Sequence, residues 1–65
     1  MTFASILTEA FKNEWMLKLY LVTDEVLNNV DITAPVARHD ELVVYKTNGE
    51  RGYIALKHIV GISLA

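Results

Sequence analysis

RGYIALKHIVGISL, the segment from Arg51 to Leu64, contains two stretches with a two-residue hydrophobic period and almost nothing between them. The first stretch is residues 53–56 and the second is residues 59–64, so only Lys57 and His58 connect them. Two residues are too few for a relaxed parallel crossover, and neither is the Gly or Asn that a tight hairpin favours. The sequence therefore predicts a sharp corner, where one strand leaves its sheet and the next begins, as in small barrels.

The last stretch is rich in Ile, Val and Leu and is predicted to lie at the edge of the subunit. An apolar edge that stays open invites pairing with another chain. The chain is also 52% apolar although it has only 65 residues, and subunit contacts would bury such a surplus. We therefore predict a cyclic homo-oligomer that assembles through the last two strands and displays Lys57 and His58 at the corner.

Composition predicts one domain, residues 1–65, without metal, cofactor or membrane partner. The chain has no cysteine and only two histidines, too few for a convincing zinc site. Its net charge of −2 argues against strong non-specific DNA binding. No apolar run approaches the roughly 20 residues of a membrane span, and no signal peptide is recognised, which predicts a soluble, cytoplasmic protein.

Residues 2–13 have the pattern of an amphipathic helix that packs on the rest of the subunit. Apolar side chains recur at helical spacing, and Thr2 is a suitable N-cap. The polar side is predicted to consist of Thr8, Glu9, Lys12 and Asn13.

The rest of the chain predicts five strands, at about residues 15–22, 26–33, 41–47, 51–57 and 59–64. Asn48-Gly49 between two apolar runs is a strong hairpin signal, and Asn28-Asn29 predicts a bend within the second strand. Gly52 is expected to allow a bend or a close neighbour. The predicted fold is mainly β: an N-terminal α-helix followed by a strongly bent, five-stranded antiparallel SH3-like barrel.

This order of elements resembles the Sm-like (LSm) family, and the bacterial Hfq-like proteins are its nearest members. The resemblance covers nearly the whole chain. It is carried by the first strand, Leu17 to Val22, by Val43 to Asn48, and by Leu56 to Val60, which contains the Lys-His pair of the second Sm motif. The chain departs from the family at Asn28-Asn29, where glycine is usual, and in a longer loop that contains Pro35 and lacks an evident base-stacking residue.

The resemblance implies a ring, in which the fourth strand of one subunit pairs with the fifth strand of the next. It also implies that Lys57 and His58 contact single-stranded, U-rich RNA at the central pore, and that Asp40 corresponds to the family's loop aspartate. Five, six and seven subunits all remain open.

The candidate RNA-binding residues are Lys57 and His58 at the corner and Arg38, His39 and Asp40 on the loop. A lysine attracts phosphate and an imidazole stacks on or hydrogen-bonds an exposed base. On the loop, Arg38 could meet a phosphate and His39 could stack, although a merely solvated loop is the favoured explanation of these residues. No Ser or Cys nucleophile accompanies the His-Asp pair, so we predict no enzyme and no small-molecule substrate.

Two other functional interpretations stay open. The ring could be a scaffold that binds proteins and has no nucleic-acid role, which fits the acidic charge. A strand-swapped dimeric antitoxin or transition regulator is also built from short β-chains, but such a protein usually has a more basic DNA-binding face.

Overall fold

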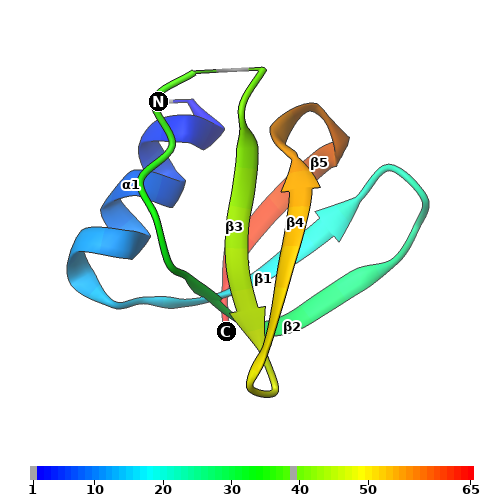
Figure 1. Ribbon diagram of the computed structural model, residues 1–65. Helices are drawn as coiled ribbons and strands as arrows, with labels where there is room; N and C mark the ends of the chain where they lie inside the picture. The colour runs from blue at the N-terminus through cyan, green and yellow to red at the C-terminus, as the bar shows by residue number, and fades with distance from the viewer. Residues whose placement is uncertain (1, 39) are drawn as a thin grey trace.

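A computed structural model describes residues 2–38 and 40–65 of the chain (Figure 1). One α-helix precedes five strands and a short 3₁₀-helix, η1. Their bounds are α1 Phe3–Asn13, β1 Met16–Leu21, β2 Val26–Ile32, β3 Leu42–Thr47, β4 Glu50–Ala55, η1 Leu56–His58 and β5 Ile59–Leu64. The predicted fold class, a helix followed by a bent five-stranded antiparallel sheet, is confirmed.

Thr2 caps the N-terminus of helix α1 as predicted, and its side chain accepts a hydrogen bond from the backbone N–H of Ser5. The Ser5 hydroxyl lies 3.1 Å from the Thr2 backbone nitrogen, which completes a capping box. The apolar stripe packs on the sheet and buries Leu7 and Ala10. The prediction that Thr8 lies on the polar side is wrong, because its hydroxyl donates to the Val36 carbonyl at 2.8 Å and accepts from the Val36 N–H at 3.1 Å.

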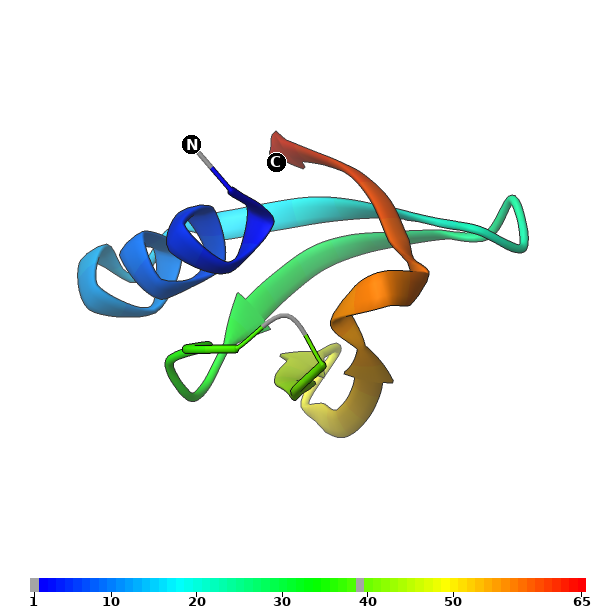
Figure 2. The ribbon, with the colours of Figure 1, turned by 90° about the horizontal axis from the view of Figure 1, so that it is seen from above.

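The sheet has the strand order β4-β3-β2-β1-β5, and all its pairs are antiparallel. The predicted bend in β2 is present: Asn29 has a φ of 52°, and the register with β1 shifts between Leu17 and Leu19. A residue with positive φ opposite a register shift is a β-bulge, which increases twist and bends the strand. This bend lets the short sheet curl around one apolar core (Figure 2).

The core is made of aliphatic side chains from the helix, the strands and the loop before β3. Its buried members are Leu7, Ala10, Leu17, Leu19, Val30, Ile32, Val36, Val43, Leu56 and Ile59. Within the described residues no polar or charged side chain is buried. The fold is therefore stabilised by hydrophobic burial, and polar side chains are left on the surface.

The barrel predicted from the sequence is not closed. Among the described residues no ladder joins β4 to β5, so these strands form the two free edges of the sheet. The physical reason is η1, which turns the chain after β4 so that β5 pairs with β1 and not with β4. The predicted corner and the predicted edge position of the last strand are both confirmed.

The free edges present backbone groups in a defined alternation. The Ala65 N–H donates to the Met16 carbonyl at 3.0 Å, which makes these two residues a hydrogen-bonded pair between β5 and β1. In an antiparallel ladder the neighbouring residues alternate, so the N–H groups of Ile62 and Leu64 point away from β1. Between β3 and β4, the Leu56 N–H donates to the Glu41 carbonyl at 3.2 Å, so Glu41 and Leu56 are a hydrogen-bonded pair. The direction of every N–H group along β4 follows from this pair by the same alternation.

In β4 the outward N–H groups are those of Arg51, Tyr53 and Ala55. Each of them stands opposite β3 in a pair without mutual hydrogen bonds, so its backbone groups face away from the sheet. Both edges are therefore able to accept another strand without breaking an existing ladder.

The β3–β4 hairpin has the predicted two-residue turn. Asn48 and Gly49 both have positive φ values, 52° and 81°, as the type I′ turn of a two-residue hairpin requires. Across the hairpin, the Tyr45 ring lies over Gly52, so a Cβ atom at position 52 would stand 2.5 Å from Tyr45 Cζ. Gly52 thus permits the close neighbour that the sequence suggested.

Replacing Gly52 by alanine is expected to lower the free energy of unfolding by about 1 to 3 kcal/mol, because the half-buried Tyr45 ring must move away. Urea denaturation of Gly52→Ala at fixed protein concentration measures this loss. The same substitution in a Tyr45→Leu background should cost much less, since the end of the ring is gone. An equal cost in both backgrounds would contradict the assigned contact.

Candidate nucleic-acid interface

Lys57 and His58 occupy η1, and we refer to them as the Lys-His corner. Leu56 precedes them and is 2% exposed, so it anchors the turn in the core, whereas both corner side chains are exposed. The His58 carbonyl accepts a hydrogen bond from the Val22 N–H at 2.8 Å. This bond joins the corner to the β1–β2 turn. The backbone of the corner is therefore fixed by the buried Leu56 on one side and by this hydrogen bond on the other, and the two exposed side chains project from it.

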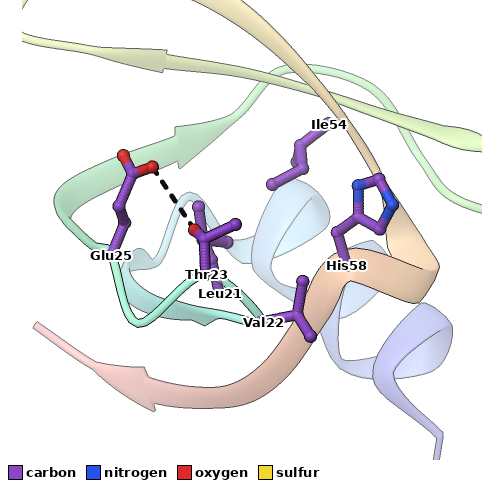
Figure 3. Close-up of a pocket in the computed structure, with 6 residues that line it drawn as sticks. All are labelled: Leu21, Val22, Thr23, Glu25, Ile54 and His58. Atoms are coloured by element: carbon purple, nitrogen blue, oxygen red, sulfur yellow. Dashed lines mark hydrogen bonds between the residues drawn. The ribbon is translucent and has the colours of Figure 1, made fainter.

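A hollow of about 290 Å³ lies between the corner, the β1–β2 turn and β4 (Figure 3). Its walls are mostly apolar, and its lining residues are Leu21, Val22, Thr23, Glu25, Ile54 and His58. The Thr23 hydroxyl donates to Glu25 Oε1 at 3.3 Å and holds that carboxylate beside the hollow. Apolar walls next to an imidazole suit a flat, weakly polar ring such as a nucleobase.

Sequence reasoning did not find the hollow. Thr23 and Glu25 fall between the predicted strands 15–22 and 26–33, and the structure places them in the turn between β1 and β2. The sequence signal for it was Val22, an apolar residue next to the turn. In the structure Val22 lies just after the end of β1, and its side chain is 59% exposed. Which strand end faces which turn depends on the register of the whole sheet, and no short motif encodes that register.

No family model, characterised protein or solved structure that was compared matches this chain. The site must therefore be interpreted from its own residues and from the physical chemistry of their arrangement.

The loop candidates form a separate feature. Arg38 donates to both carboxylate oxygens of Asp40, at 3.2 and 3.0 Å, and both side chains are more than 70% exposed. His39, the third loop candidate, lies outside the described residues. No hydrogen bond or ion pair in the described parts of the chain joins Arg38 or Asp40 to the Lys-His corner. Because this ion pair is exposed to solvent, it is weak and fixes the Arg38 guanidinium only loosely.

Two further features of the described residues concern metal ions and membranes. In residues 2–38 and 40–65 no three His, Cys, Asp or Glu side chains gather as a metal-binding group. The same ranges contain no helix with the length and apolar character needed to cross a membrane.

Proposed function

We propose that this chain is a non-enzymatic, Sm-like cytoplasmic protein that forms a ring and binds single-stranded RNA at the Lys-His corner. The observation that carries the proposal is the open sheet, whose free edges β4 and β5 are separated along the chain only by that exposed corner. Everything else in the proposal builds on this arrangement.

Ring formation would satisfy both free edges at once. In the proposed assembly β4 of one subunit pairs with β5 of the next, through the outward N–H and carbonyl groups of Tyr53 and Ile62 and their alternate neighbours. Such a heterologous contact must close into a ring if open fibres are to be avoided. Five, six and seven subunits are compatible with this pairing, and the angle between neighbours selects among them.

Closure would bring one Lys-His corner from every subunit around a common axis. Repetition turns a single lysine charge into a focused positive field, even though each chain carries a net charge of −2. The imidazole of His58 stacks on or hydrogen-bonds an unpaired base, and the adjoining hollow offers that base apolar walls. The Sm-like resemblance makes a U-rich strand the ligand to test first.

The double variant Lys57→Ala, His58→Ala is expected to weaken binding of oligouridine about tenfold or more, because one phosphate contact and one stacking contact are lost in each subunit. Fluorescence anisotropy titrations at several salt concentrations measure the affinity, and light scattering checks that the particle mass is unchanged. Lys12→Ala is the matched control, since it removes an exposed lysine far from the corner in sequence. A double variant that binds every RNA as well as the parent would refute the RNA-binding site.

A scaffold without a nucleic-acid role is the second candidate function. Negative charge favours it, because Glu25 stands beside the hollow and the chain as a whole is negatively charged. A scaffold would form the same ring but would have no salt-dependent affinity for RNA. The salt titration of the unaltered protein therefore separates the two functions.

A further inference from the structure

An apolar groove lies between helix α1 and the edge strand β5, and we call it the helix groove. Its volume is about 160 Å³, and most of its walls are apolar. The lining residues are Ile6, Trp15, Leu17, Ile62, Ser63 and Leu64. Leu17 belongs to the core, whereas Trp15 and Leu64 are exposed. The groove therefore extends the core to the surface beside a free edge of the sheet.

The turn that ends α1 fixes Trp15 at this groove. The Trp15 N–H donates to the Ala10 carbonyl at 3.0 Å, and Glu14 has a φ of 57°. Left-handed backbone is unfavourable for a residue with a Cβ atom, and glycine is the usual residue where a helix ends in this way. The indole nevertheless stays 42% exposed. A large aromatic wall is thus held in place and only half covered by its own chain.

The outward backbone groups of the two edges decide which side chains can reach the groove. They belong to Tyr53 on β4 and to Ile62 and Leu64 on β5. Antiparallel pairing is the arrangement of every existing pair in the sheet, and it is the more stable one per residue.

In antiparallel pairing, residues with outward groups stand directly opposite one another, and opposite residues place their side chains on the same face. Tyr53 of one copy therefore lies on the face where Ile62 and Leu64 of the next copy line the helix groove. This result does not depend on the register, because every register that satisfies the outward groups obeys the same alternation.

Tyr53 has the size and the chemistry that the groove requires. Its ring is 61% exposed, on the face of β4 opposite the core-facing Ile54. An apolar cavity of about 150 Å³ holds one benzene molecule, so the helix groove has room for one aromatic ring. A phenol ring stacks on an indole in an offset or edge-to-face arrangement, and its hydroxyl can stay at the wet, open side.

We propose that Tyr53 of one copy fills the helix groove of the next copy and packs against Trp15. The site is incomplete in a single chain, which supplies the walls, and the neighbouring copy supplies the aromatic ring. This inference rests on the assembly in the proposed function and adds a side-chain contact to the backbone pairing. Each copy gives one ring and receives one, so the contact is heterologous and repeats around a closed assembly.

Trp15 is the single tryptophan of the chain, so its fluorescence reports on the groove without a label. In the unaltered ring, acrylamide should quench Trp15 less, and its emission should lie at shorter wavelength, than in the separate chains of Tyr53→Pro, which lacks the outward N–H. Tyr53→Thr keeps the backbone pairing and should remain a ring at the concentrations used for light scattering. Its Trp15 should nevertheless be quenched as strongly as in the separate chains.

Dilution measures how much the contact stabilises the ring. The ring of Tyr53→Thr should dissociate at a protein concentration roughly tenfold higher than that of the parent, because each interface loses the burial of one aromatic ring. Mass photometry across a dilution series gives this concentration.

A variant on the other wall tests the same contact from the opposite side. Leu64→Asp places a carboxylate in the groove, which the ring of Tyr53 would have to desolvate. It should raise the dissociation concentration roughly tenfold or more. The matched control is Val26→Asp, which adds the same charge at an exposed valine of β2, a strand without a free edge, and should dissociate like the parent. Adding Tyr53→Thr to Leu64→Asp should cause little further loss, since both changes remove one contact.

The outcomes separate failure of the groove contact from failure of the proposed function. If Trp15 is quenched equally in the rings of the parent and of Tyr53→Thr, the groove contact is refuted and the ring stands. If Trp15 is protected by Tyr53 but the variant Lys57→Ala, His58→Ala binds RNA like the parent, the groove contact stands and the RNA site is refuted. A parent that stays monomeric at every concentration refutes both.

Discussion

Tyr53→Pro is expected to convert a ring of five to seven chains into separate folded chains. Proline has no N–H, and its ring projects where the hydrogen of residue 53 would meet the neighbouring strand. The N–H of Tyr53 points outward from β4, so the β3–β4 ladder keeps all its hydrogen bonds. Light scattering behind a sizing column should give the unaltered particle a mass of five to seven times 7.3 kDa, and the variant 7.3 kDa.

The matched control for this substitution is Tyr53→Thr, which removes the aromatic ring but keeps the N–H and a side chain that favours strands. The control should retain the mass of the ring, and circular dichroism should show strand content in all three proteins. A parent that is itself a monomer or dimer would refute circular pairing through β4 and β5. A proline variant that keeps the full ring would refute β4 as the pairing edge.

Leu19→Ala is expected to lower the free energy of unfolding by about 2 to 5 kcal/mol, the largest loss that we predict for a single side chain. Leu19 is fully buried at the centre of the core, and its strand, β1, pairs with both β2 and β5. Truncation removes three buried carbon atoms and leaves a cavity that the surrounding strands cannot fill without disturbing two ladders. Urea denaturation at one protein concentration measures the loss, because oligomer stability depends on concentration.

Leu42→Ala provides the comparison for Leu19. Leu42 is the same residue type in a strand, but it is 57% exposed, so its truncation should change the free energy of unfolding by no more than about 1 kcal/mol. Similar losses for the two variants would show that β1 is not the centre of the core.

Local features of this fold could be predicted from the sequence because each depends on a few neighbouring residues. Thr2 caps α1, Asn48-Gly49 forms the hairpin turn, and Asn29 adopts the positive φ that bends β2. The corner at Lys57 and His58 was predicted because two residues leave few ways to connect two strands. In each case the length of the connection or the backbone preference of one residue was enough.

Features that depend on strand register could not be predicted. The opening between β4 and β5, the hollow beside His58 and the contact of Thr8 with Val36 each join segments that are distant in sequence. The pairing of Lys46 with Arg51 across the β3–β4 hairpin is an intermediate case. The Asn-Gly turn fixes Lys46 opposite Arg51. The face of the sheet on which this pair lies, however, depends on which neighbouring side chains fill the core. Register over the whole sheet is a collective property of the packed core.

The pairing of β5 with β1 has a kinetic consequence. It brings together residues as distant as Tyr20 and Ser63, which are 43 positions apart, so most of the chain must be gathered before this ladder exists. Contacts of such long sequence separation slow folding, because the entropy of loop closure is lost before the contacts form. The outward edge of β5 is created only when that step is complete. Growth of any assembly through this edge is therefore limited, at high protein concentration, by a unimolecular event within each chain.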